Sequence, residues 1–122
     1  MNKRDARPAF QPGTNIAVKV PPHEFAALAA FYGEVLGFER LEVPGPGAAY
    51  RFGDKILWID PVAQLSQAEI WLELRCDDPD QAAGWLDQAG VRRCDDIEAL
   101  PDDLQGFWIT APGNLVHLVC RG

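Results

Sequence analysis

The residues best suited to acid–base chemistry in this chain are one histidine and two glutamates. His117 lies inside the apolar run 115–120, while Glu69 and Glu73 lie four residues apart in an alternating segment. Such groups act as general acids or bases when their surroundings perturb their pKa. The plainer alternatives stay open: a half-buried histidine satisfied by a hydrogen bond, and a solvated carboxylate face.

Three tryptophans fall at positions suited to lining a binding surface. Trp58 and Trp71 alternate with Leu and Ile along extended segments, and either Trp108 or its neighbour Phe107 must share their side. Aromatic side chains that line a concave surface favour flat or apolar ligands. Core packing is the alternative for any tryptophan.

The three cysteines carry no recognisable motif. Cys76, Cys94 and Cys120 are odd in number and show no C-x-x-C spacing, so neither zinc nor redox chemistry is predicted from them. They are typical of reduced, mostly buried thiols, and we expect a cytoplasmic protein.

Composition and charge exclude several classes of partner. The 122 residues are 48% hydrophobic and 24% charged, an ordinary balance for one folded domain. The net charge is −7, and nine of the 18 acids lie between Asp77 and Asp103, which opposes nucleic-acid binding. No apolar run reaches the roughly 20 residues of a membrane span, and the basic N-terminus lacks the apolar stretch of a secretory signal. We therefore expect no nucleic-acid partner and no membrane association.

The elements that must position these residues occur twice along the chain. The alternating segments 16–20 and 70–74 are 54 positions apart, and each precedes a proline-marked helical pattern. The first helix is predicted over about residues 22–36. The second is predicted to begin after the N-cap Asp78 and to end at Gly90.

Each half continues in the same way. A glycine, Gly37 or Gly90, follows each helix, as is typical of helix C-termini. Two extended runs joined by a tight turn then end each half, over 48–52 and 55–60 and over 107–111 and 115–120. The chain thus predicts two βαβββ modules, over about residues 14–60 and 69–121. We expect a flexible arm over residues 1–12 and a single domain over residues 13–122.

Two motifs in this pattern resemble those of the vicinal oxygen chelate superfamily, which includes glyoxalases, bleomycin-resistance proteins and extradiol dioxygenases. The segment 31–38 is similar to the family's F-Y-x-x-x-L-G-F helix exit, and 113–118 is similar to its terminal G-N-x-x-E-L strand. The resemblance implies an α+β fold in which the paired modules form a curved mixed sheet around a central cup. It also implies a homodimer.

The resemblance places four metal-ligand positions at Asn15, Trp58, Glu69 and His117. Metal-using relatives carry histidine at the first position and glutamate at the second. A tryptophan cannot bind a divalent cation and asparagine is a weak ligand, whereas a catalytic zinc site needs about three protein ligands. We therefore expect no cofactor and no complete metal site. A divalent metal, if one binds, would be held by Glu69 and His117.

Alternation along the strands predicts which side chains face the cup. It places Asn15, Trp58, Glu69, Trp71 and Glu73 on the face away from the helices. His117 is predicted to share this face because Val116 and Leu118 are assigned to the helix side.

Three functions remain open from the sequence. The first is metal-independent binding of a small organic ligand in an aromatic-lined cup, similar to bleomycin-resistance proteins. Its predicted binding residues are Asn15, Trp58, Trp71, Glu73 and Trp108. The second is a lyase, isomerase or dioxygenase that uses Glu69 and His117 as catalytic residues, so enzymatic activity stays undecided. The third is a dimeric module whose own side chains fill the cup, and the acidic segment 95–104 is expected to be a solvated loop.

Overall fold

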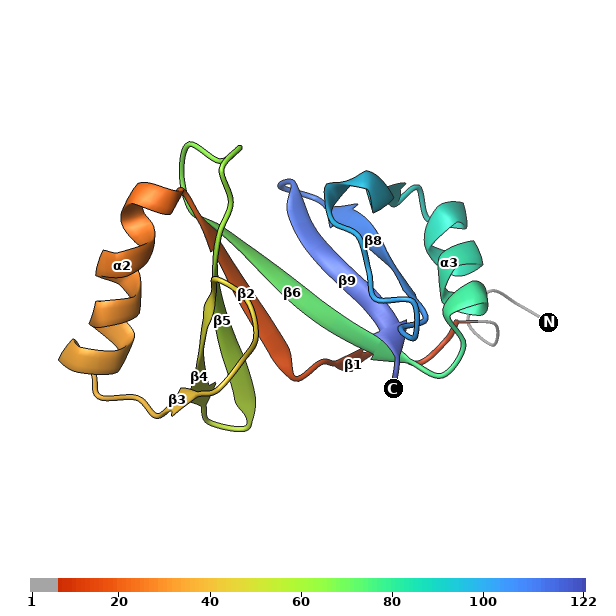
Figure 1. The fold of residues 1–122 in the computed structure, drawn as a ribbon. Coiled ribbons are helices and arrows are strands. Elements are labelled where there is room, and N and C mark those ends of the chain that lie inside the picture. The colour runs from red at the N-terminus through yellow and green to blue at the C-terminus, as the bar shows by residue number, and fades with distance from the viewer. Residues whose placement is uncertain (1–6) are drawn as a thin grey trace. The chain divides into compact units, whose positions relative to one another are not determined.

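The computed structural model describes residues 7–122. Within them, nine strands and two α-helices follow one another along the chain (Figure 1), so the predicted α+β class is confirmed. The strands are β1 Gln11–Pro12, β2 Asn15–Val20, β3 Arg40–Leu41, β4 Ala48–Phe52, β5 Lys55–Pro61, β6 Glu69–Cys76, β7 Arg92–Arg93, β8 Gly106–Ala111 and β9 Leu115–Arg121. The helices are α2 Pro22–Ala30 and α3 Pro79–Gln88. In this described part of the chain, no helix is long and apolar enough to cross a membrane.

The chain divides into two compact units. The N-terminal unit comprises Thr14–Trp71, and the C-terminal unit comprises Leu72–Gly122 with the described residues that precede Thr14. The boundary falls inside β6. Its first three residues pair with β2, and its last five pair with β9.

Both units have the same strand order, which confirms the predicted pair of βαβββ modules. In the N-terminal unit the order is β3-β4-β5-β2, and β2 runs parallel to β5. In the C-terminal unit the order is β7-β8-β9-β6, and β6 runs parallel to β9. The remaining pairs within each module are antiparallel. Each sheet is therefore mixed.

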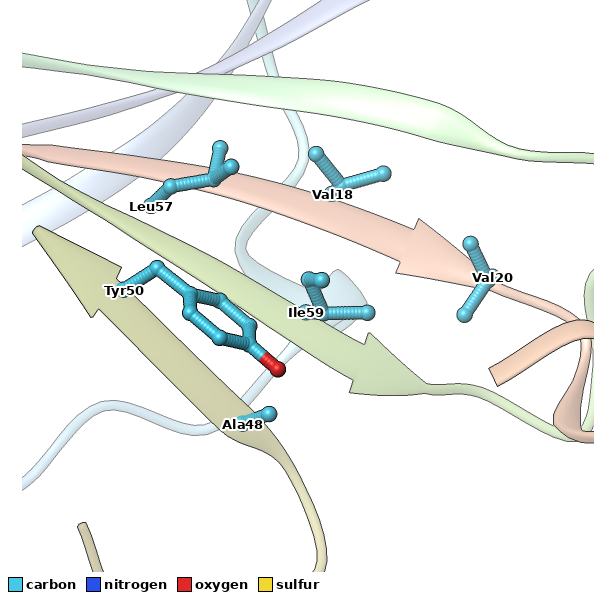
Figure 2. Close-up of a cluster of buried hydrophobic side chains, with 6 residues drawn as sticks. All are labelled: Val18, Val20, Ala48, Tyr50, Leu57 and Ile59. Atoms are coloured by element: carbon cyan, nitrogen blue, oxygen red, sulfur yellow. The ribbon is translucent and has the colours of Figure 1, made fainter. Parts of the chain in front are cut away.

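The core of the N-terminal unit lies between its sheet and α2. Figure 2 shows the buried cluster of Val18, Val20, Ala48, Tyr50, Leu57 and Ile59. Phe25 and Leu28 of α2 pack against this cluster, and the Tyr50 hydroxyl donates a hydrogen bond of 2.9 Å to the Ala29 carbonyl. These contacts fix which face of the sheet the helix covers.

The first helix ends differently from the prediction of a continuous helix to residue 36. After Ala30 the chain forms one turn of π-helix over Phe31–Val35, closed by a hydrogen bond of 2.9 Å from the Leu36 N–H to the Phe31 carbonyl. A Cβ at Gly33 in this turn would lie 3.2 Å from the Tyr50 hydroxyl oxygen. The absence of a side chain at Gly33 thus lets the wider turn approach the core tyrosine.

The second helix follows the sequence prediction closely. Asp78 caps α3, and its Oδ1 accepts hydrogen bonds from the N–H groups of Asp80 at 3.1 Å and Gln81 at 3.3 Å. Gly90 follows the helix with a φ of 81°, in the left-handed region that glycine favours. The core beneath α3 is formed by Cys76, Ala82, Phe107, Ile109 and Val119.

The end of the predicted N-terminal arm, over residues 1–12, takes part in a strand pairing. Residues 1–6 lie outside the described residues, but Gln11 and Pro12 form β1 and pair with Arg75 and Leu74 of β6. The Gly13 N–H also donates a hydrogen bond of 2.8 Å to the Glu73 carbonyl. Backbone pairing therefore orders the end of this segment.

Candidate functional site

Two tryptophans lie on the face of the N-terminal sheet that points away from α2. The register of β2 places Trp58 of β5 on one side of Ala17 and Trp71 of β6 on the other. Ala49 of β4 pairs with Trp58 on its far side. Because paired residues point to the same face of a sheet, the two indoles lie in one row with Ala17 and Ala49, and with Leu41 of β3, which pairs with Ala49.

Hydrogen bonds hold both indole rings. Trp58 Nε1 donates to Asn15 Oδ1 at 2.7 Å, and Trp71 Nε1 donates to Glu69 Oε1 at 2.9 Å. Trp71 is 5% exposed, whereas Trp58 is only partly buried. Trp58 is thus the more accessible aromatic surface of this pair.

A charged row lies beside the tryptophans, formed by Asp60, Lys19 and Glu69, which pair in register across β5, β2 and β6. Lys19 is only 3% exposed. Its Nζ lies 2.9 Å from Asp60 Oδ2 and 4.5 Å from the centre of the Trp71 ring. A buried ammonium requires such partners to offset its lost hydration.

The sequence did not identify Lys19 and Asp60 as site residues. The alternation that places Asn15 and Trp58 on the face away from the helix extends to Lys19 and Asp60, but a lysine and an aspartate at strand positions are usually solvated. The sequence feature that could have identified Lys19 and Asp60 is their equal spacing from Ala17 and Trp58, which pair with each other in the neighbouring row. Lys19 follows Ala17 by two residues, and Asp60 follows Trp58 by two.

In the C-terminal unit, Glu73 and Trp108 lie on the face away from α3. The Glu73 side chain is 7% exposed and its Oε1 lies 3.2 Å from Arg75 Nη2, so an ion pair offsets its charge. The Trp108 backbone N–H donates to Asp95 Oδ1 at 3.0 Å, and its indole Nε1 donates to the Glu98 carbonyl at 2.9 Å. The start of the acidic segment 95–104 therefore holds Trp108, in addition to being exposed.

His117 lies on the side of its sheet that faces α3, which corrects the prediction. Register pairs His117 with Ile109 and Val119 with Phe107. Ile109, Phe107 and Val119 all belong to the core cluster that includes Ala82 of α3. Since His117 shares their side of the sheet, it does not lie on the face that carries Glu73 and Trp108.

The prediction assigned the wrong set of alternating β9 residues to the side that faces α3. The run 115–120 is apolar at every position except His117, so alternation alone cannot tell which side is the core. Val116 and Val119 are both buried, at 5% and 0% exposure, although they lie on opposite faces. The His117 Nδ1 lies 3.0 Å from the carbonyl of Leu115, which is consistent with a structural histidine.

Two of the four metal-ligand positions that the resemblance implies, Asn15 and Glu69, carry oxygens that accept indole N–H groups. Asn15 Oδ1 accepts the Trp58 indole N–H, Glu69 Oε1 accepts the Trp71 indole N–H, and the tryptophans have no metal-binding atom. Among residues 7–122, no group of three or more histidine, cysteine or acidic side chains could hold a metal ion.

The two buried cysteines are poorly suited to nucleophilic chemistry. Burial raises the pKa of the Cys76 thiol, and the neighbouring Asp77 adds to the effect. Burial also raises the pKa of the Cys120 thiol, with a further contribution from Glu73. Because the thiolate is the reactive form, both side chains are expected to be inert at neutral pH.

Comparison with known proteins identifies the fold. No family model and no curated protein matches the sequence. The Mn(II)-bound glyoxalase from Novosphingobium aromaticivorans superposes with a TM-score of 0.67 at 18% identity, over 94% of this chain and 40% of that chain. Homoprotocatechuate 2,3-dioxygenase from Brevibacterium fuscum gives 0.62 at 16%, over 93% and 33%. Methylmalonyl-CoA epimerase from Mycobacterium tuberculosis gives 0.63 at 14%, over 90% and 87%.

These structures are vicinal oxygen chelate proteins, and their likeness shows that this chain has the same fold. The chain spans well under half the length of the glyoxalase and the dioxygenase, and most of the length of the epimerase.

Proposed function

We propose that this chain binds a small organic ligand with a flat apolar part, using the tryptophan face of the N-terminal unit. The observation that carries the proposal is the orientation of the two indoles. Their N–H groups are bonded to Asn15 and Glu69, so the Trp58 ring surface is what this row offers to a ligand. Ring surfaces held in this way favour stacking with flat molecules.

The fold supports a small-molecule ligand. The similar structures are named as a glyoxalase, a homoprotocatechuate dioxygenase and a methylmalonyl-CoA epimerase, and each name describes chemistry on a small organic molecule. We propose that binding here does not depend on a metal held by Asn15, Trp58, Glu69 and His117. The support is the donor set, because Asn15 and Glu69 each accept an indole N–H.

The positions of Glu69 and His117 do not support the catalytic alternative that uses them as a pair. Glu69 lies on the face away from α2 and accepts the Trp71 N–H. His117 lies on the α3 side of its own sheet, beside Ile109. A binding function therefore accounts better for the described side chains.

Ligand binding can be tested with a flat neutral probe. We expect 4-nitrobenzyl alcohol to bind in calorimetry and to quench tryptophan fluorescence. Trp58→Leu should weaken its binding roughly tenfold, the scale of a lost aromatic contact together with its buried area. Trp85→Leu, on α3 in the other unit, is the matched control and should leave the affinity unchanged. Equal affinities in the two variants would contradict the proposal.

Metal independence needs its own measurement. A ligand that binds the native state raises the unfolding midpoint by mass action. Zn²⁺, Ni²⁺, Mn²⁺ and Fe²⁺ are expected to leave the midpoint unchanged. A rise that disappears in Glu69→Ala and His117→Ala would instead show a metal site.

A further inference from the structure

The buried ion pair beside Trp58 has one accessible member. The Lys19 side chain is 4% exposed and the Asp60 side chain is 30% exposed, with Nζ and Oδ2 2.9 Å apart. A molecule that approaches this face therefore meets the carboxylate of Asp60 and not the ammonium beneath it. The ammonium fixes the position of that carboxylate.

The charged row carries a net negative charge. It contains two carboxylates, Asp60 and Glu69, and one ammonium, Lys19, and the Trp71 ring also lies against that ammonium. Arg51 is on the same face but pairs with Ile56, on the opposite side of Trp58 from Asp60. The end of the face at Asp60 therefore attracts cations and hydrogen-bond donors.

The spacing between Trp58 and Asp60 suits a compact ligand. Asp60 follows Trp58 by two positions on β5, which corresponds to about 6.5–7 Å along a strand. An aromatic ring that lies on the indole, with an amine or hydroxyl one carbon beyond the ring, spans this distance once the hydrogen bond is included. Gly47 contributes to the space, because a Cβ there would lie only 2.7 Å from Asp60 Oδ1.

We propose that Asp60, held by the buried Lys19, is the specificity residue of this face and selects flat aromatic ligands that carry an ammonium group over those that carry a carboxylate. The inference rests on the proposed function, because it names the class of ligand for the same surface. Hydrogen bonds between charged groups are the strong ones, and the adjacent Trp58 ring adds a favourable contact for a cation. A carboxylate ligand would instead meet the exposed Asp60 carboxylate, which has the same charge sign.

Three probes of one shape test this inference: 4-nitrobenzylamine, 4-nitrobenzyl alcohol and 4-nitrobenzoate, measured by calorimetry at pH 7 and low salt. We expect the amine to bind at least tenfold more tightly than the carboxylate, with the alcohol between them. Asp60→Asn should lower the affinity for the amine about tenfold and change that for the alcohol less than twofold. Asp54→Asn, in the exposed β4–β5 turn, makes the same change in net charge and should leave all three affinities unchanged.

The outcomes separate the two proposals. If all three probes bind equally and Trp58→Leu weakens them together, the tryptophan face binds ligands but Asp60 does not select them. Tighter binding of the carboxylate, or equal effects of Asp60→Asn and Asp54→Asn, would also overturn the inference. If no probe binds to the wild type, both proposals fail. Thermal unfolding of each variant shows whether it is folded, and Asp60→Glu provides a second variant that keeps the charge and should retain the preference for the amine.

Discussion

Adding one methyl group at Gly13 is expected to destabilise the folded protein. A Cβ at this position would overlap the carboxylate and Cγ of Glu73, whose side chain is buried and paired with Arg75. We expect Gly13→Ala to lower the free energy of unfolding by about 1–3 kcal/mol, the usual cost of overpacking. Urea denaturation measures this change, and an unaltered midpoint would mean that Glu73 moves aside freely.

The buried thiols predict a difference in reactivity. Burial raises the pKa of Cys76 and Cys120, and Cys94 is less buried than either. In native protein at pH 8, a disulfide reagent such as DTNB is expected to label Cys94 first, with the other two labelled only as the protein unfolds. Rapid labelling of Cys76 or Cys120, located by mass spectrometry, would contradict this.

The same thiols predict an alkaline loss of stability. Because their pKa values are raised in the folded state, the unfolded chain loses these protons first as the pH rises. Their contribution is complete below the ordinary thiol pKa and is lost as the pH rises from there through the raised folded values. The double variant Cys76→Ala/Cys120→Ala should show a smaller fall in urea midpoint than the wild type between pH 7.5 and pH 10. If the urea midpoints of the two proteins fell equally over this pH range, groups other than these thiols would cause the loss of stability.

At the scale of elements, α3 depends on its N-cap. Asp78 accepts two backbone hydrogen bonds at the start of the helix, and the loss of such a cap costs about 1 kcal/mol. We expect Asp78→Ala to destabilise the protein by that amount in urea denaturation.

Gly84→Ala in the same helix should instead raise the free energy of unfolding. A Cβ at Gly84 meets nothing within 4 Å, and alanine is favoured over glycine in a helix interior by about 0.5–1 kcal/mol. If this variant were also destabilised, the packing of α3 would have to be tighter than the structure describes.

Elements with strong local signals could be predicted from the sequence. Asp78, Pro79 and Gly90 mark the bounds of α3 through capping chemistry that acts within a few residues. The π-helical turn at Phe31–Val35 could not be predicted in this way, because it accompanies a tertiary approach between Gly33 and Tyr50. The prediction for the side chain of His117 was wrong for a related reason. Both faces of β9 bury apolar side chains, so the sequence pattern does not show which face packs against α3.

In the candidate site, too, the sequence predicted some features and could not predict others. Alternation placed Asn15, Trp58 and Trp71 on one face because the opposite face carries the aliphatic side chains that pack under α2. The bonds that hold these residues, from Trp58 to Asn15 and from Trp71 to Glu69, depend on register and rotamer, which a pattern does not specify. The pairing of Lys19 with Asp60 likewise required the parallel register of β2 and β5.

At the scale of the whole molecule, we propose the homodimer that the sequence led us to expect. Apolar side chains near the end of α2 are unusually exposed, at 42% for Phe31, 72% for Val35 and 45% for Leu36, and a closed two-fold pairing is the commonest way to cover such a surface. Sedimentation at tens of micromolar should give the mass of a dimer, and Val35→Lys should shift it towards the monomer. A monomeric mass for the wild type would contradict the proposal.

The division of β6 between the two units decides how this chain can be cut. A fragment that stops at Ala68 would lose Glu69–Trp71, and residues 17–19 of β2 would then form an unprotected edge, which invites pairing with other chains. A fragment that begins at Leu72 would start in the middle of a strand. A split version of the protein, such as a two-part reporter, would therefore need residues 69–76 in both fragments.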